Sequence, residues 1–176
     1  MNLLRTLATA HWTHGGPPPP LPGFSASTFN PLVAAVAELC LAEGYGEPGP
    51  PRRTGLLLAS AGGDRTTALA IDTGAAGRRM PPLLFFQSNP NAVLGHVAAR
   101  WQLTGPVVAI SPREAAAPGE VPPDALESAA LLLADGDADH VLVIAAEQAD
   151  PADPAGHASA GHASADRATA VLVATA

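Results

Sequence analysis

The sequence contains no lysine, only one cysteine and few aromatic residues, which make up 4% of the chain. Its nine basic residues are therefore all arginines, and they are scattered apart from the pairs at 52–53 and 78–79. Nucleic acids and anionic membrane surfaces attract clustered basic side chains. Together with a formal net charge of −7, this pattern argues against both as partners.

The low cysteine content excludes an internal disulfide, because Cys40 has no second thiol to pair with. No apolar run approaches the roughly 18 to 20 residues that a membrane-spanning helix requires. Residues 1–16 carry one arginine and an interrupted hydrophobic stretch, unlike a secretory signal peptide. We therefore expect a cytoplasmic protein, in which Cys40 is a buried structural thiol.

Hydrophobic residues make up 47% of the 176 residues, so the scarcity of aromatics means that Ala, Leu and Val must build the core. Small and aliphatic side chains suit tightly packed layers of helix on sheet. The proline-rich stretch "GGPPPPLPG" at 15–23 predicts a stiff extended linker. We expect a leader and linker at 1–29 and one folded domain at 30–176.

Helical and strand patterns alternate along the predicted domain. Helix openings are expected at Asn30 with Pro31, at Asp64, at a second Asn-Pro pair and near Asp124. Continuously apolar strand candidates are "TGLLLA" at 54–59, "GPVVAIS" at 105–111, "HVLVIAAE" at 140–147 and "RATAVLVATA" at 167–176. Strands that are apolar throughout are typical of a buried, mainly parallel sheet. The predicted fold class is α/β.

Two blocks of this pattern carry a family resemblance. "NAVLGHVAARWQLTGPVVAIS" at 91–111 and "ALESAALLLADGDADHVLVIAAE" at 125–147 resemble the N-terminal half of a β-ketoacyl synthase, a member of the thiolase fold. "RRTGLLLASAGGDRTT" at 52–67 is similar to that family's first core strand and following turn. The resemblance covers residues 30–176 and implies half of a thiolase-like fold, with a mainly parallel mixed sheet and helices on both faces.

The resemblance also implies a nucleophile that this sequence lacks. The family places a cysteine at a sharp turn between strand and helix, where the helix N-terminus favours the thiolate. Counting forward from Pro106 reaches Glu114, and counting backward from Gly136 reaches Gly119. The difference implies an insertion within residues 112–123, and neither position holds a cysteine. The family's second half, with two catalytic histidines, has no counterpart up to residue 176, so we expect no catalytic residues.

The resemblance further implies a subunit interface. In the family, the strand equivalent to residues 107–111 pairs across the interface, and a free sheet edge invites such pairing. The expected interface residues are Val107, Val108, Ala109, Ile110 and Ser111, with His96 as a packing or interface residue. The expected partners are a full-length ketosynthase and an acyl carrier protein, or a second copy of the chain where no such partner exists.

Three functions remain open at this point. The first is a non-catalytic subunit similar to the chain-length factors of type II polyketide systems, which associates with an active ketosynthase. The second is an enzyme, a decarboxylase or hydrolase, that processes carrier-bound acyl groups through Glu114 or Ser111. The third is a self-associating structural protein.

Other polar motifs carry weaker signals. His157 and His162 stand in a near-repeat that could contribute to a metal site, but no cysteine or patterned carboxylate completes the set, which favours a surface loop. "SAGG" at 60–63 lacks the lysine of a phosphate-binding loop and the dinucleotide spacing. Glu147, at a strand end, is expected to hydrogen bond to loops. We predict neither a metal nor a cofactor.

Overall fold

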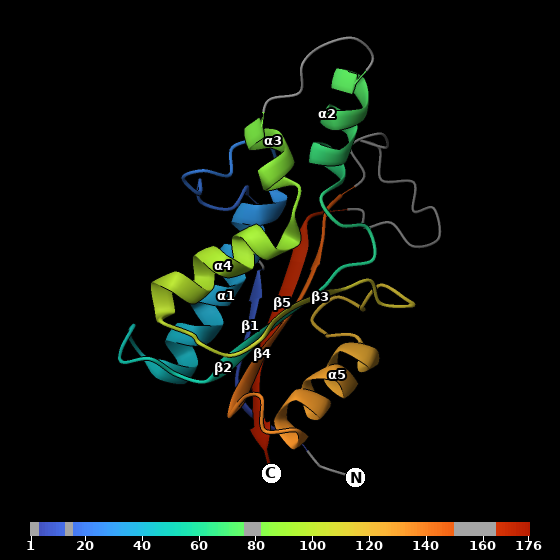
Figure 1. Cartoon of the computed structure of the whole chain (residues 1–176). Helices are drawn as coiled ribbons and strands as arrows, with labels where there is room; N and C mark the ends of the chain where they lie inside the picture. The colour runs from blue at the N-terminus through green and yellow to red at the C-terminus, as the bar shows by residue number, and fades with distance from the viewer. Residues whose placement is uncertain (1–3, 13–15, 76–81, 150–164) are drawn as a thin grey trace.

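A five-stranded mixed sheet lies at the centre of the computed structural model, which describes residues 4–12, 16–75, 82–149 and 165–176. Across the sheet the strand order is β1-β5-β4-β2-β3 (Figure 1). The strands are β1 (Leu4–Trp12), β2 (Thr54–Ala59), β3 (Val107–Ile110), β4 (His140–Glu147) and β5 (Arg167–Thr175). β2 pairs parallel with both β3 and β4, whereas β5 pairs antiparallel with both β4 and β1.

Helices cover both faces of this sheet, as predicted. The helices are α1 (Phe29–Tyr45), α2 (Arg65–Ala75), α3 (Pro82–Gln87), α4 (Pro90–Trp101) and α5 (Pro123–Ala134). α1 and α4 pack on one face and α5 packs on the other, while α2 and α3 stand beyond the carboxyl ends of β2 and β4 (Figure 1). No helix of the described residues is both long and apolar enough to cross a membrane.

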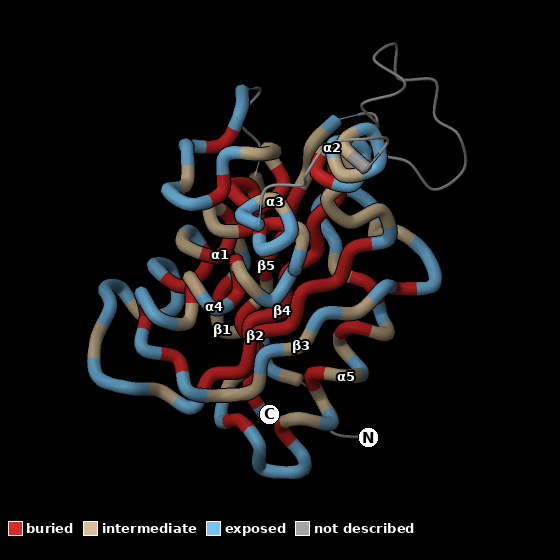
Figure 2. The backbone as a smooth tube through the Cα atoms, turned by 45° about the horizontal axis from the view of Figure 1, so that its top comes forward, coloured by how far each residue is buried: buried red, intermediate tan, exposed pale blue. Residues whose placement is uncertain are grey.

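The central strands are apolar throughout because each of their faces contacts a different helical layer. Leu142 and Ile144 of β4 point into the core beneath α1 and α4, and Val141 and Val143 point toward α5. All four side chains are fully buried, and Figure 2 shows this part of the sheet as the buried centre of the chain. Continuous apolarity therefore predicts these strands correctly.

The N-terminal segment differs from its prediction as a leader and linker. β1 forms an edge of the sheet, and Ala8 and Phe24 are buried in the core that α1 and α4 cover. A β-bulge between Thr6 and Ala8 shifts the register with β5, so Leu4 packs on the α5 side and Ala8 on the α1 side. An extra residue in a strand reverses which side chains face each layer.

The start of α1 also differs from its prediction. Thr28 is the N-cap residue, and Asn30 lies buried in the first turn. Instead of capping the helix, the Asn30 side chain donates a hydrogen bond to the carbonyl oxygen of Gln87, with 2.9 Å between the two atoms. By contrast, Asn89 caps α4 as expected, because its side chain accepts a hydrogen bond from the Asn91 N–H.

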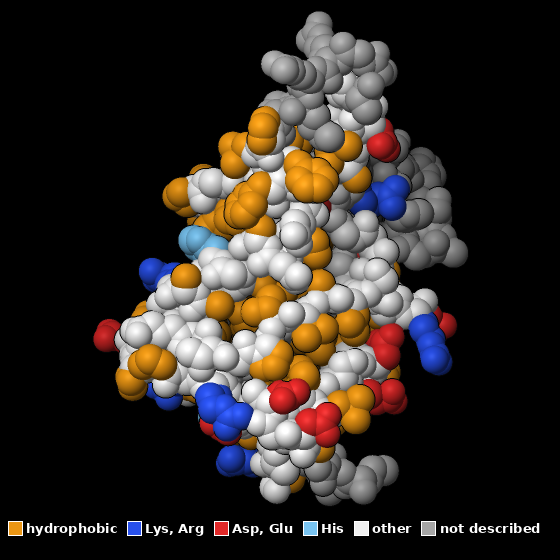
Figure 3. All heavy atoms as spheres, in the orientation of Figure 1, with side chains coloured by type: hydrophobic (Ala, Val, Ile, Leu, Met, Phe, Trp, Pro, Cys, Tyr) orange, Lys and Arg blue, Asp and Glu red, His pale blue; other side chains and the backbone are white. Residues whose placement is uncertain are grey.

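Strand β3 is an edge strand and not the buried strand that its apolar sequence predicts. Val107 and Ala109 are exposed, and Val108 and Ile110 are half-buried against the α5 layer. Hydrophobic side chains gather across the face of the molecule on which β3 lies (Figure 3). Among the described residues no strand pairs with the outer side of β3, and a free apolar edge invites pairing.

Candidate functional site

The free edge of β3 has a defined backbone pattern. The N–H of Leu56 donates to the Pro106 carbonyl at 2.8 Å, and the N–H of Ser60 donates to the Ile110 carbonyl at 3.2 Å. Backbone groups of successive residues in a strand point to opposite sides. The even-numbered residues of β3 therefore bond to β2, and the N–H and C=O groups of Val107 and Ala109 point outward, as does the N–H of Ser111.

The turn before β3 fixes the position of this edge. The N–H of Thr104 donates to the Arg52 carbonyl at 2.8 Å, and the N–H of Gly105 donates to the Thr54 carbonyl at 3.2 Å. A Cβ atom added at Gly105 would lie 2.5 Å from backbone atoms of Gly55 and Thr54. The backbones meet so closely that only glycine fits, which gives a physical reason for the glycine in "LTGP".

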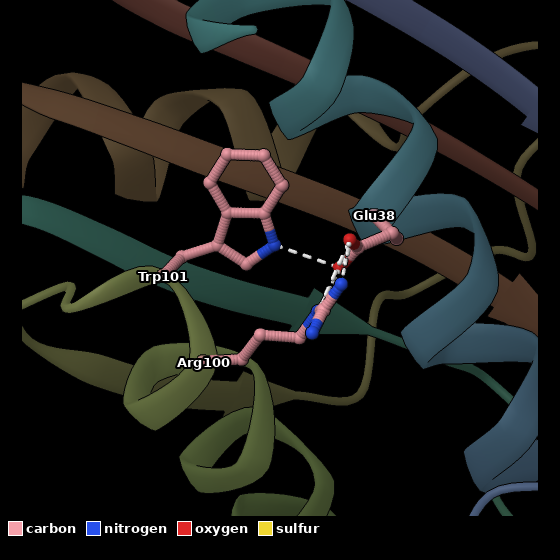
Figure 4. A network of polar contacts seen from close by, with 3 residues as sticks. All are labelled: Glu38, Arg100 and Trp101. Atoms are coloured by element: carbon pink, nitrogen blue, oxygen red, sulfur yellow. Dashed lines mark hydrogen bonds and ion pairs between the residues drawn. The ribbon is translucent and has the colours of Figure 1, made fainter. Parts of the chain in front are cut away.

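A polar cluster anchors the end of α4 immediately before this turn. The Glu38 carboxylate of α1 accepts hydrogen bonds from the Arg100 guanidinium at 2.9 to 3.1 Å and from Trp101 Nε1 at 2.7 Å (Figure 4). Burial raises the pKa of Glu38, but these donors outweigh burial and hold the pKa below its usual 4.5. The cluster joins α1 to α4 beside the buried Trp101 ring.

A cavity of about 220 Å³ lies at the carboxyl end of β3. Strand ends, the N-termini of α1 and α4 and the end of α3 enclose it. Its lining residues are Phe29, Asn30, Leu58, Ser60, Gly63, Asp64, Gln87, Ser88, Pro90, Ala109, Ile110 and Ser111. The carboxyl ends of parallel strands are where open α/β sheets bind ligands. Ser111, one of the two residues named for the alternative of an acyl-processing enzyme, reaches this cavity, but none of the described lining residues is a histidine.

Asp64 forms one wall of the cavity with all of its partners inside the protein. Its carboxylate accepts hydrogen bonds from the Ser27 hydroxyl at 2.8 Å, from Asn30 Nδ2 at 3.4 Å and from both the N–H and the hydroxyl of Thr67. The Thr67 bonds cap α2, as the sequence predicts for Asp64. These hydrogen bonds fix the orientation of the Asp64 carboxylate at the wall of the cavity.

The turn after β2 is closed by an internal carboxylate. Glu147, buried at the end of β4, accepts hydrogen bonds from the N–H of Ala61 at 2.7 Å and from the N–H of Gly62 at 3.0 Å. These N–H groups are the donors that the "SAGG" motif would offer to a phosphate. Glu147 therefore occupies the position of an anion, and its predicted role in bonding to a loop is confirmed.

The two positions expected for the lost nucleophile lie in an exposed loop. Residues 111–122 connect β3 to α5, and both Glu114 and Gly119 are exposed. The Arg113 N–H bonds to the Asp124 carboxylate at 3.1 Å, and Arg167 donates to the Ala116 carbonyl at 2.9 Å. The loop is thus held against α5 and β5, and Glu114 does not line the cavity that contains Ser111.

His96, the other predicted interface residue, lies apart from the β3 edge. Its ring contacts Phe24 edge to face, with 6.1 Å between ring centroids, and it lines a separate groove beside Pro19 and Pro20. Of the predicted interface residues, Ala109, Ile110 and Ser111 thus line the cavity, whereas His96 packs against Phe24 on another part of the surface. His157 and His162 lie outside the described residues.

A second polar cluster, which sequence reasoning missed, lies at the opposite end of the sheet. Tyr45 Oη is 2.7 Å from both Thr54 Oγ1 and His140 Nδ1, and the Arg52 guanidinium lies 4.3 Å above the Tyr45 ring. The four residues come from three elements and one loop, so only the folded chain brings them together. The cluster ties the end of α1 to the first residues of β2 and β4.

This cluster predicts a loss of stability in mild acid. Burial lowers the pKa of His140 below its usual 6.5. The positive charges of Arg52 and Arg5 also lower this pKa, whereas the negative charge of Asp139 raises it. Below about pH 6.5 the unfolded chain therefore binds more protons than the folded chain does, so stability falls as the pH decreases toward the lowered pKa. Urea unfolding between pH 7 and 5 should show this fall, and His140→Gln should flatten it. An equal slope in the variant would contradict the prediction.

Comparison with known proteins identifies the fold. No protein-family model and no curated protein matches the sequence. A ketosynthase in complex with its chain length factor from Xenorhabdus doucetiae matches with a TM-score of 0.62 and 18% identity, over 89% of this chain and 62% of that chain. The ishigamide ketosynthase/chain length factor matches with a TM-score of 0.69 and 20% identity, over 89% of this chain and 46% of that chain.

A third match is a type II polyketide synthase acyl-carrier protein in complex with its ketosynthase bound to the hexaketide. It has a TM-score of 0.69 and 11% identity, over 99% of this chain and 63% of that chain. The chain thus spans between 46% and 63% of the length of these three proteins. The matches confirm the predicted α/β, thiolase-like ketosynthase fold.

Proposed function

We propose that this chain is a non-catalytic, chain-length-factor-like subunit that pairs with a full-length ketosynthase. The observation that carries the proposal is the free, apolar edge of β3 in a chain with the ketosynthase fold. Two of the matched structures include a ketosynthase and a chain length factor, which supports a partner of this kind. We place the pair in the cytoplasm and expect an acyl carrier protein to reach it through the ketosynthase.

The outward groups of β3 support pairing through the backbone. Val107 and Ala109 each offer one N–H and one C=O on the free side, and the Ser111 N–H extends this row. A strand of the ketosynthase that runs antiparallel to β3 could form one pair of hydrogen bonds with Val107 and a second pair with Ala109. The side chains of β3 are aliphatic and that of Ser111 is uncharged, so pairing would bury no unpaired charge.

The absence of a nucleophile supports a role without catalysis. Cys40 is the only cysteine, and it lies fully buried in α1, where burial raises the pKa of its thiol to about 11. A thiol with such a pKa is neutral at physiological pH and is a poor nucleophile. Residues 111–122, where the family resemblance locates the turn of a catalytic cysteine, form a loop that contains no cysteine.

The proposal predicts that Ala109→Pro separates the subunits while the chain stays folded. Proline removes the outward N–H and adds a ring at the free edge, and it is tolerated on edge strands whose N–H faces away from the sheet. We expect binding to weaken at least tenfold. The measurement is co-expression of the chain with tagged ketosynthases of its source organism, followed by light scattering and titration calorimetry on the purified complex.

Ala109→Ser is the matched control, because it keeps the N–H and the small size of the side chain. It should bind like the original chain, and the melting temperatures of both variants should stay within a few degrees of it. Full binding by Ala109→Pro would show that β3 is not the interface. Failure of the original chain to bind any ketosynthase would overturn the proposed function itself.

A further inference from the structure

The end of the molecule next to the cavity carries an exposed apolar surface. We define the α3 surface as Leu83, Phe85 and Phe86, whose exposed fractions are 53%, 69% and 52%. Leu69 of the neighbouring helix α2 is also exposed. Single exposed apolar residues are common on proteins, but grouped large ones mark interaction sites. Figure 3 shows hydrophobic side chains gathered over α3 on the face that also carries β3.

Charged residues are nearly absent from this part of the chain. Between Pro82 and Pro112 the sequence holds one Asp, Glu, Lys or Arg residue, which is Arg100. Arg100 is paired with Glu38 of α1, so its charge is balanced within the subunit. A segment that has exposed aromatic residues but few charges has the composition of the central part of a protein interface.

The α3 surface adjoins the β3 edge through the cavity. Gln87 and Ser88, at the end of α3, line the same cavity as Ala109 and Ser111. A chain that pairs with β3 would therefore approach α3 across the mouth of this cavity.

The size of β3 shows that an interface must extend beyond it. β3 has four residues, whereas a stable interface buries about 800 Å² on each partner and involves about 20 to 30 residues a side. We infer that the α3 surface is the second part of the ketosynthase-binding interface, an inference that rests on the proposed function. The partner carries an apolar, charge-poor surface that covers Phe85 when its strand pairs with β3.

The protein holds α3 in place for such a contact. The Gln87 side chain is buried and accepts a hydrogen bond from the Ala26 N–H at 2.8 Å, and its carbonyl accepts one from Asn30. The Phe86 ring packs against Phe24, with 6.0 Å between centroids. Phe85 makes no such ring contact with the residues that the structure describes, and it is the most exposed of the three. Because Gln87 and Phe86 hold the helix in place, Phe85 is presented from a fixed backbone, and binding needs to order only its side chain.

The test is a titration of the tagged ketosynthase with Phe85→Glu. We expect binding to weaken at least tenfold, because the variant places a charge in the centre of an apolar contact. Leu131→Glu is the matched control: Leu131 is 63% exposed but lies on α5, which packs on the other face of the sheet. It should bind like the original chain, and both variants should keep its circular dichroism spectrum and melting temperature.

Hydrogen exchange on the unmodified chain gives a second measurement that needs no variant. In the complex, the amides of α3 should exchange at least tenfold more slowly, together with the outward amides of β3. If Phe85→Glu binds fully while Ala109→Pro does not, the inference about α3 is wrong and the proposed function stands. If α3 is protected only in a homodimer and no ketosynthase binds, both the inference and the proposed function are wrong.

Discussion

Gly105→Ala is expected to lower the free energy of unfolding by about 3 kcal/mol, the upper end of the range for overpacking. The added Cβ would lie 2.5 Å from the Gly55 nitrogen and from the Thr54 carbonyl carbon. Both are backbone atoms of β2, which cannot move aside as a flexible side chain could. Urea unfolding monitored by circular dichroism should show the loss as a lower midpoint with an unchanged slope.

Gly95→Ala is the control, and it should change stability in the opposite direction. Gly95 lies in α4, is exposed, and has no atom within 4 Å of an added Cβ. Alanine in a helix is more stable than glycine by about 0.5 to 1 kcal/mol. If both variants had the same stability as the original chain, the close contact at Gly105 would not constrain the fold. Because Gly105 leads into β3, its variant should also weaken ketosynthase binding.

The central strands could be predicted because one physical rule determines them. β2, β4 and β5 are buried on both faces, so the middle parts of their sequences are almost entirely apolar. The helices between them begin at recognisable caps such as Asn89 and Asp64. The same rule failed for β3. β3 is also apolar, but only one of its faces packs against the rest of the chain. The sequence alone does not show that its outer edge has no neighbouring strand among the described residues.

The N-terminal strand could not be predicted for a different reason. β1 mixes arginine and threonine with apolar residues, and its bulge at Leu7 breaks the alternation that would indicate a half-buried strand. Helix α3 was also missed, because its six residues are too few to show a helical period. β1 pairs with β5, and α3 is hydrogen bonded to the start of α1. Both partners lie far away in the sequence.

The candidate site was predictable in part. The family resemblance indicated residues 107–111 as an interface, and the structure places these residues at a free edge beside a cavity. The polar side chains around that cavity could not be assigned from sequence, because their partners come from several elements. Asn30 resembles a helix cap but bonds to the end of α3, and Glu147 reaches the turn after β2. Glu114 and Gly119, which were chosen by counting, lie in a loop whose length counting could not resolve.

Glu147→Ala is expected to destabilise the protein by about 3 kcal/mol. The change removes a buried carboxylate that accepts hydrogen bonds from the N–H groups of Ala61 and Gly62, at 2.7 and 3.0 Å. Bonds to a charged acceptor contribute about 1.5 to 3 kcal/mol each, and N–H groups left without a partner lose further free energy. Glu127→Ala makes the same chemical change on the exposed side of α5 and should change stability by less than about 0.5 kcal/mol.

The variant also tests whether Glu147 stands in for a bound anion. Without its carboxylate, the two N–H groups form an open concavity that suits a sulfate or phosphate ion. An ion that binds only the folded state raises stability with its concentration. Sulfate should therefore raise the melting temperature of Glu147→Ala by more than it raises that of the original chain, in which the same groups are occupied. An equal rise in both proteins would show that sulfate acts only through general exclusion from the surface, and that the turn after β2 has no affinity for anions once its own carboxylate is gone.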